Sequence, residues 1–364
     1  SGPCLAPPLV LQEGMRHLLT TLLLLALSSL SGLLARSLGL PLPFMIGPLI
    51  LTGIIATALP ERLPEGYKFP PGLRIVFISV IGLMIGAQVT AELLAAAPRL
   101  MLSFAALTLF TVTAHAFNYT VFRRIGGYDR ATAFYAATPG GLYESIALGE
   151  EAGADMARLM LQQFLRIIVV VTVLPLGLQI WLGQPVGSSG GMTLARHAVP
   201  WSDLPWIVLA GGAGYLLGRV LRLPAGQLTG PLALAAILSV SGLYPLDIPQ
   251  WLVNVAQIVI GSALGMRFTG ISRRLILRGT RLALMSVGGM LLLAAFFAEV
   301  LHVAVGEPFD VMLISFAPGG VTEMALIALS LQANPALVTL HHIWRILITV
   351  VGLGLSARWL RRHL

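Results

Sequence analysis

The sequence predicts an all-α polytopic membrane protein, and three observations lead to that prediction: the composition, a series of long apolar segments and an internal duplication. Hydrophobic residues make up 57% of the 364-residue chain, whereas charged residues make up only 10%. An ordinary soluble domain carries about 25% charged residues. Most of this protein's surface must therefore face lipid, which excludes a soluble enzyme, a coiled coil and a disordered scaffold.

The charge balance favours membrane topology over nucleic-acid binding. The chain has 23 Lys and Arg residues against 15 Asp and Glu residues. The basic residues occur in short loops between apolar segments, as the positive-inside rule requires. We therefore expect a lipid bilayer around the protein and no nucleic acid as a partner. The single cysteine, Cys4, excludes a disulfide framework.

Apolar segments of about 20 residues predict helices that cross a hydrocarbon core about 30 Å thick. Six such segments occur in each half of the chain: 16–36, 43–59, 73–92, 99–122, 130–150 and 157–182, then 204–221, 227–244, 251–269, 280–302, 309–330 and 335–358. We accordingly expect an N-terminal tail over 1–15, a first membrane repeat over 16–182, a linker rich in Gly and Ser over 183–203 and a second membrane repeat over 204–364.

The two halves are repeats of one another. At an offset of 179 residues, Pro139-Gly140-Gly141 matches Pro318-Gly319-Gly320, Glu144 matches Glu323, Arg166 matches Arg345, and Gly82 and Gly86 match Gly261 and Gly265. A Glu and an Arg inside apolar segments would not coincide often by chance. We expect the last four glycines to allow close helix packing.

Corresponding loops of the two halves carry opposite charge bias, which predicts that the halves run through the membrane in opposite directions. The loop after the third segment has only Arg99, whereas its counterpart has five arginines between residues 267 and 281. Inversion needs an odd number of crossings per half, so one of the six segments should enter and leave by the same face. The best candidates are 130–150 and 309–330, because Pro-Gly-Gly breaks each near its middle. A broken helix that crosses is the alternative, and in the re-entrant arrangement both termini lie on the basic, cytoplasmic side.

The two breaks are the candidate substrate site. Their residues are Thr138, Pro139, Gly140 and Gly141 in the first half and Pro318, Gly319 and Gly320 in the second. Non-helical backbone at membrane depth is tolerated only where it is buried in protein or lines a wet cavity. A helix that starts after the glycines presents unpaired N–H groups, which suit an anion. The simpler interpretation is that Pro-Gly-Gly only kinks two packing helices.

Four charged residues lie well inside apolar segments: Glu144, Glu323, Arg166 and Arg345. Such groups are costly in hydrocarbon and usually face the interior of a bundle or water. One interpretation is two structural ion pairs, Glu144–Arg166 and Glu323–Arg345. The other is that an arginine binds a substrate carboxylate through two N–H groups while a glutamate carries a proton.

His341 and His342 align with Gln162 and Gln163 of the first half. Because histidine titrates in the physiological range, either residue could take part in proton coupling, although a structural hydrogen bond is the favoured interpretation. The sequence contains no catalytic constellation, metal-ligand cluster or ATP-binding motif. We therefore expect no metal, no cofactor and no enzymatic activity.

With its two Pro-Gly-Gly blocks, each followed by a Glu and an Arg, the chain resembles the AbrB-type bacterial membrane protein family from about residue 16 to about residue 360. The Gly-Pro-Leu motifs at 47–49 and 230–232 and the internal duplication are typical of that family. Its members often bear the label ammonia monooxygenase, which these residues do not support because no copper-ligand cluster is present. The family is similar to the cation:proton antiporter/anion transporter group, and this resemblance implies inverted repeats and alternating access.

We therefore expect a secondary active transporter of a small organic anion, coupled to H⁺ or Na⁺, in the bacterial inner membrane. Its substrate site is expected at the midplane, between the two breaks. A homodimer is compatible with these features. The alternatives are a non-transporting regulatory or channel-like membrane protein and a metal-dependent membrane oxidase.

Overall fold

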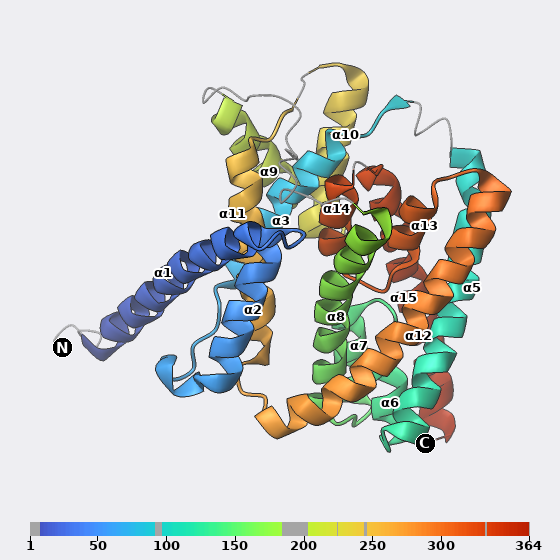
Figure 1. Cartoon of the computed structure of the whole chain (residues 1–364), viewed down its shortest axis with the longest axis horizontal. Helices are drawn as coiled ribbons and strands as arrows, with labels where there is room; N and C mark the ends of the chain where they lie inside the picture. Colours follow the sequence, from blue (N-terminus) through green and yellow to red (C-terminus); the bar gives the residue numbers. More distant parts are fainter. Residues whose placement is uncertain are drawn as a thin grey trace, which may run out of the picture.

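The computed structural model describes residues 8–91, 97–183, 203–223, 225–243, 246–331 and 333–363. Within these ranges every regular element is helical (Figure 1). The first half contains α1 (Pro8–Ser37), α2 (Pro43–Ala58), α3 (Pro71–Gly86), α5 (Ala97–Thr120), α6 (Arg130–Ala136), α7 (Leu142–Glu151) and α8 (Met156–Leu182). The second half contains α9 (Leu204–Val220), α10 (Gly226–Ser241), α11 (Gln250–Gly265), α12 (Arg273–Val305), α13 (Phe309–Phe316), α14 (Val321–Ser330) and α15 (Pro335–His363).

The prediction of an all-α polytopic membrane protein is confirmed. Six helices of the described ranges are long and apolar enough to cross a membrane, namely α1, α5, α8, α11, α12 and α15. The helices α2, α3, α9 and α10 have 16 or 17 residues, which is about 25 Å at 1.5 Å per residue. All twelve predicted apolar segments coincide with one helix or with a pair of short ones.

The structure bears on the N-terminal tail and on the linker that the sequence predicted. Helix α1 begins at Pro8, so residues 8–15 extend the first helix, where the sequence suggested a tail. The predicted linker 183–203 lies outside the described residues except at its two ends.

The repeated glycines lie at close helix contacts between the halves, as predicted. A Cβ atom built on Gly82 or Gly86 of α3 would lie 2.4 or 2.2 Å from a carbonyl oxygen of α10. A Cβ atom built on Gly261 or Gly265 of α11 would lie 2.3 or 2.5 Å from a carbonyl oxygen of α2. Only a residue without a side chain allows backbones to approach this closely. The packing is therefore crosswise: α3 of the first half pairs with α10 of the second, and α11 pairs with α2 (Figure 1).

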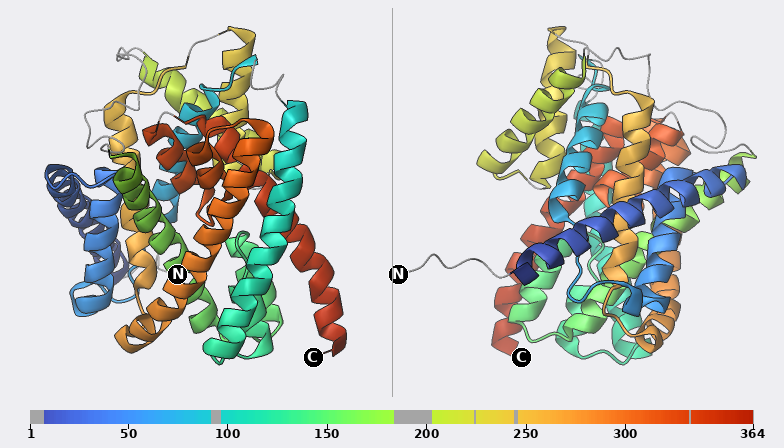
Figure 2. Two further views of the ribbon diagram at one scale, coloured as in Figure 1. Left: turned by 45° about the vertical axis from the view of Figure 1, so that its right-hand side comes forward. Right: turned by 90° about the vertical axis from the view of Figure 1, so that its left-hand side faces the viewer.

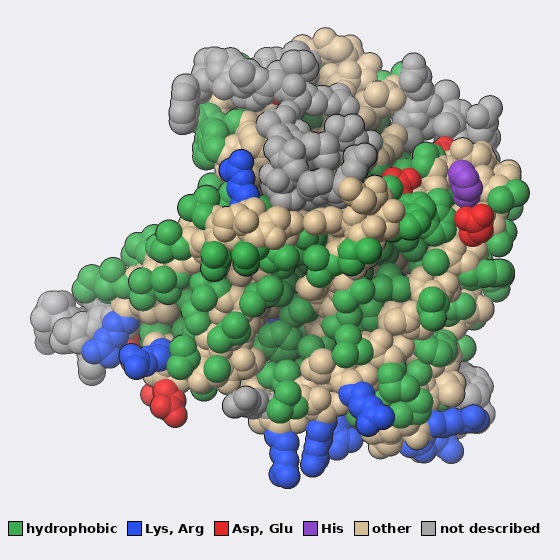
Figure 3. Space-filling model, in the orientation of Figure 1, with side chains coloured by type: hydrophobic (Ala, Val, Ile, Leu, Met, Phe, Trp, Pro, Cys, Tyr) green, Lys and Arg blue, Asp and Glu red, His purple; other side chains and the backbone are tan. Residues whose placement is uncertain are grey.

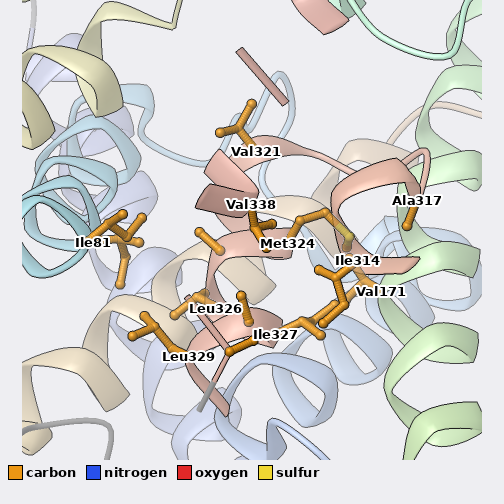
Figure 4. Close-up of a cluster of buried hydrophobic side chains, with 14 of the residues drawn as sticks. Ile81, Val171, Ile314, Ala317, Val321, Met324, Leu326, Ile327, Leu329 and Val338 are labelled. Carbon is orange, nitrogen blue, oxygen red and sulfur yellow. The ribbon is translucent and has the colours of Figure 1, made fainter. Parts of the chain in front are cut away.

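The helices α12 and α15 make most of their contacts with elements outside these two pairs. Helix α12 packs against α5, α8 and α13, and α15 packs against α5, α7, α13 and α14 (Figure 2). All ten residues of α14 are buried. Met324, Leu326 and Ile327 of this helix pack in the apolar core together with Val171 of α8 and Val338 of α15 (Figure 4). A short helix that is apolar on every side must be covered on every side, and this arrangement covers it.

Basic side chains gather at one end of the molecule (Figure 3). This is the end where α5 stops and α12 starts (Figure 1). Arg123 and Arg124 lie in the turn that follows α5, and Arg274 lies in the first turn of α12. The turn 121–125 contacts α12 directly. Loops that the sequence assigns to one membrane face therefore lie together in space.

Candidate functional site

The first break separates α6 from α7 and has a clear local cause. Asp129 caps the start of α6 by accepting a hydrogen bond from the Thr132 amide at 2.8 Å. The helix stops at Ala136 because Pro139 has no N–H to donate and two glycines follow it. Gly141 has a φ of 61°, a left-handed conformation that costs other residues about 1–2 kcal/mol. The α7 helix then starts anew at Leu142.

The second break separates α13 from α14. Helix α13 ends at Phe316, one residue before Ala317 and two before Pro318. The N-cap position of α14 is Gly320, with φ −78° and ψ 150°, so an ordinary extended backbone suffices there. The two predicted breaks are therefore both present, although the backbone at their last glycine differs.

The two membrane arginines bind the backbone of the two breaks. The Arg166 guanidinium on α8 donates to the carbonyl oxygen of Thr138. On α15, the Arg345 guanidinium donates to the carbonyl oxygens of Ala317 and Gly319, the second at 2.7 Å. Arg166 is 6% exposed and Arg345 only 1%. Each arginine therefore satisfies carbonyl groups that lost their helical partners at the break.

The two arginines form no ion pair with a carboxylate among the described residues. Of the two interpretations that the sequence left open, the structural ion pairs Glu144–Arg166 and Glu323–Arg345 are therefore not found among the described residues. The Nε atoms of both guanidinium groups are buried and have no hydrogen-bond partner in the described part of the chain. Arg166 binds the carbonyl oxygen of Thr138, and a Cβ atom built on Gly140, two residues further on, would lie 3.5 Å from Arg345 Nε, so both guanidinium groups lie against the first break. A pair of buried cations with unused donors is costly unless an anion joins them.

The carboxyl groups of the two glutamates lie over the N-terminal ends of their own short helices. Glu144 and Glu323 both stand in the first turn, of α7 and α14 respectively. A Cβ atom built on Gly320 would lie 2.1 Å from Glu323 Oε2, and one built on Gly141 would lie 3.5 Å from Glu144 Oε2. A carboxylate in the first turn stabilises the positive end of a helix dipole. Glu323 is 6% exposed, so its carboxyl group lies at this helix end in the buried interior.

We expect Gly320→Ala to reduce the free energy of unfolding by about 1 kcal/mol, because a methyl group at this position displaces the Glu323 carboxylate from the helix start. Adding Glu323→Ala to that variant should change the stability little further, since the interaction is already lost. The matched control is Gly140→Ala, whose Cβ would meet its nearest atoms at 3.4 to 3.7 Å, ordinary contact distances. Equilibrium unfolding in SDS measures all three; equal losses for Gly320→Ala and Gly140→Ala would contradict the assignment.

A network of neutral polar groups supports the first break, and sequence reasoning assigned it no role. The Gln163 side-chain amide donates to Thr138 Oγ1 at 2.8 Å and to the carbonyl oxygens of Tyr135 and Ala136. Thr138 Oγ1 lies 2.6 Å from Ser145 Oγ. Gln163 precedes Arg166 by one helical turn, so the two side chains share one face of α8. That spacing is the signal that could have linked Gln163 to the break.

The two histidines of α15 are fully buried. His341 Nδ1 lies 2.9 Å from the carbonyl oxygen of Leu337, and His341 Nε2 lies 2.8 Å from Ser103 Oγ. The structural hydrogen bond favoured by sequence reasoning is therefore confirmed for His341. His342 lies beside Arg345, near enough for electrostatic interaction. Of the two, His342 is the one that adjoins the arginine site.

The first break also touches the second half of the chain. A Cβ atom built on Gly140 would lie 3.5 Å from Arg345 Nε and 3.4 Å from Thr349 Oγ1. Arg345 therefore holds its own break through carbonyl groups and lies against the other break with its unpaired Nε. The structure brings the two Pro-Gly-Gly segments and both arginines into one buried cluster. In the described ranges, no three His, Cys, Asp or Glu side chains gather as a metal site would require.

Most of the chain is similar to known proteins. The sequence model of a family described as "Transition state regulatory protein AbrB" matches residues 44–361. The chain is 27% identical over 332 residues to "Putative regulator AbrB" of Escherichia coli (strain K12), which covers 90% of each protein. It is 25% identical over 357 residues to "Uncharacterized protein YhjN" of Bacillus subtilis (strain 168), which covers 92% of this chain and 91% of that protein. The family match includes both breaks and both buried arginines.

Proposed function

We propose that this chain, which belongs to the AbrB family, is a secondary active transporter of a small organic anion. The observation that carries the proposal is the pair of buried guanidinium groups, Arg166 and Arg345, which lie against the two breaks and lack a carboxylate partner in the described residues. An arginine fork matches the geometry of a carboxylate. A bound anion would supply the missing negative charge, and its release would leave the site ready for another.

Coupling to H⁺ is proposed to involve the two glutamates. Glu144 is partly exposed and Glu323 is buried, and each carboxylate lies over a short helix that starts at a break. Protonation of either group would make the region around the breaks less negative and so strengthen the attraction for an anionic substrate. Na⁺ is the alternative coupling ion, for which the same carboxylates would serve as oxygen ligands.

The proposal includes inverted repeats in which each broken segment is a re-entrant hairpin. The crosswise contacts of α3 with α10 and of α2 with α11 support it, because they are what a pseudo-two-fold axis would generate. The Asp155 amide, at the start of α8, donates to Thr132 Oγ1, in the first turn of α6, at 2.7 Å. The start of α6 therefore lies beside the chain that follows α7. This proximity favours a re-entrant hairpin over a helix that crosses the membrane.

We propose that the protein lies in the bacterial inner membrane with both termini in the cytoplasm. Single cysteines placed next to Arg124 and Arg274, in a variant that lacks Cys4, should then react with a membrane-impermeant maleimide from the same side. An arrangement with five crossings and one re-entrant hairpin in each half requires this result, since the basic residues mark the cytoplasmic face. A cysteine next to Arg99 should react from the other side and serves as the control. Labelling of positions 124 and 274 from opposite sides would refute the arrangement.

Flux measurements test the transport function. Purified protein in proteoliposomes should accumulate at least one radiolabelled carboxylate in a saturable manner when an H⁺ or Na⁺ gradient is imposed, and collapse of the gradient should abolish the accumulation. Liposomes without protein are the control. If no member of a broad panel of organic acids shows gradient-dependent uptake, the transporter proposal is wrong.

A second candidate is a membrane-bound regulator, which the family description and the name of the Escherichia coli relative favour. In that case the same arginine site would bind an anion as a signal without moving it across the membrane. Saturable binding of a carboxylate to the purified protein without any uptake into proteoliposomes would favour this second function.

A further inference from the structure

A cavity of about 220 Å³ opens between α5, α6 and α15, beside the first break. Thr138 and Pro139 of the break form part of its wall, and Thr349 of α15 forms another part. Most of the remaining wall is apolar, from Val112, Phe134, Ile348 and Leu353. The cavity therefore has a polar inner end at the break and an apolar body.

The cavity lies at membrane depth and opens toward lipid. The parts of α5 and α15 that line it belong to helices long and apolar enough to span a membrane. Val112 is 60% exposed and Gly352 is also exposed, so the mouth of the cavity lies on the outer surface of the bundle. A molecule with an apolar part can enter here without first crossing water.

One buried polar atom in the cavity wall has no partner. His115 lines the cavity, and its Nε2 atom is buried without a hydrogen bond among the described residues. Its ring packs edge-on against Phe134, with 4.7 Å between ring centroids. A buried polar atom without a partner costs free energy, so the wall at this point is not optimised for stability alone.

The inner end of the cavity leads toward Arg345. Thr349, in the cavity wall, has its Oγ1 3.4 Å from the point where a Cβ of Gly140 would lie, and Arg345 Nε is 3.5 Å from the same point. The space left by the missing side chain of Gly140 therefore lies between the cavity and the unpaired guanidinium nitrogen. An atom at this point would contact both Thr349 Oγ1 and Arg345 Nε, so the polar end of a molecule in the cavity comes close to the guanidinium group.

We infer that this cavity is the subsite for the apolar part of the substrate, and that the substrate is a monocarboxylate with one compact apolar group. The inference rests on the proposed function, because it takes the arginine site as the place of the carboxylate. A cavity of about 150 Å³ holds a benzene molecule, so 220 Å³ accommodates a phenyl ring or a branched aliphatic chain. A small hydrophilic acid would leave the apolar walls uncovered.

The test uses Gly352→Leu, which fills the cavity, and Gly354→Leu, which does not. A Cβ atom on either glycine would meet nothing within 4 Å, so both variants fit the fold. Gly352 lines the cavity, whereas Gly354 lies two residues further along α15 and does not. Phenylacetate, acetate and succinate are the probes, and calorimetry on the purified full-length protein in nanodiscs measures their affinity.

We expect the wild-type protein to bind phenylacetate at least tenfold more tightly than acetate or succinate. Gly352→Leu should weaken phenylacetate binding at least tenfold and leave acetate binding within twofold, whereas Gly354→Leu should change neither. Equal affinities for phenylacetate and acetate, or equal effects of the two leucine variants, would overturn the subsite and leave the arginine site intact. If Gly352→Leu changes only the lipid dependence of the melting temperature, the cavity holds an acyl chain and the inference is wrong. If no acid binds to the wild-type protein, the proposed function itself fails.

Discussion

Replacing Arg345 by Gln should weaken carboxylate binding about 100-fold or more. The loss of one partner from a buried, hydrogen-bonded charge pair costs about 2–5 kcal/mol, and Arg345 is 1% exposed. The glutamine amide can still donate to the carbonyl oxygen of Ala317 or Gly319, so the fold of the second break should be retained. Arg345→Lys should also bind at least tenfold more weakly, because an ammonium group lacks the planar fork that contacts two oxygens at once.

Arg158→Gln is the matched control for this prediction. Arg158 is on the same helix as Arg166, but its side chain is 43% exposed and forms a surface ion pair with Asp155. Such pairs contribute little, so carboxylate affinity should stay within twofold of the wild-type value. Calorimetry gives the affinities and size-exclusion chromatography checks the fold. Normal affinity in a folded Arg345→Gln protein would remove Arg345 from the site.

Replacing Gly86 by Ala should destabilise the protein by about 3 kcal/mol and reduce its yield in the membrane. The added Cβ would lie 2.2 Å from the carbonyl oxygen of Leu232 and 2.8 Å from Ala235 Cβ. A backbone oxygen cannot move aside as a flexible side chain can, so α3 and α10 would have to separate. Overpacking of this kind typically costs about 1–3 kcal/mol, and occasionally more.

The control for Gly86→Ala is Gly212→Ala in α9, where a Cβ would meet nothing within 4 Å. Alanine in the interior of a helix is about 0.5–1 kcal/mol more favourable than glycine, so this variant should be slightly stabilised. The two substitutions are chemically identical and are predicted to act in opposite directions. Equilibrium unfolding in SDS measures both, and a stable Gly86→Ala protein would contradict the crosswise packing of α3 on α10.

The sequence predicted the helices well because the bilayer imposes a simple rule on them. A chain that crosses hydrocarbon must be apolar for about 20 residues and must satisfy its own backbone. The triplet Pro-Gly-Gly interrupts a helix, and both breaks are where they were predicted, whereas the single prolines Pro48, Pro175 and Pro231 lie inside continuous helices. Sequence reasoning set residues 1–15 aside as a tail, whereas α1 begins at Pro8, and a proline is well tolerated in the first turn of a helix.

The partners of the charged residues could not be predicted in the same way. Arg166 follows Glu144 by 22 residues and Arg345 follows Glu323 by the same distance, which suggested ion pairs. The repeat offset relates a residue to its counterpart but carries no information on which backbone or side chain it contacts. The arginines bind the carbonyl groups of the breaks instead, because these groups lost their helical partners and lie nearer. The carboxylates of the two glutamates lie over the starts of their own helices.

The cavity beside the first break was not visible in the sequence. His115 is a single histidine in an apolar segment, and nothing in its neighbours along the chain indicates that Thr349 lies across from it. His115 lines a cavity only because α15 of the second half packs against α5 and α7 of the first. Sites formed between repeats are in general harder to predict than sites formed within one, because no local spacing encodes them.

The central claim is that Arg166 and Arg345 together hold the anion that the protein moves. The most direct test compares uptake of phenylacetate, or of whichever acid the wild-type protein accumulates best, into proteoliposomes that contain equal amounts of wild-type protein, the double variant Arg166→Gln/Arg345→Gln and the control Arg158→Gln. We expect saturable, gradient-driven uptake by the wild type and by Arg158→Gln, and none above empty liposomes for the double variant. Uptake by a correctly folded double variant at the wild-type rate would contradict it.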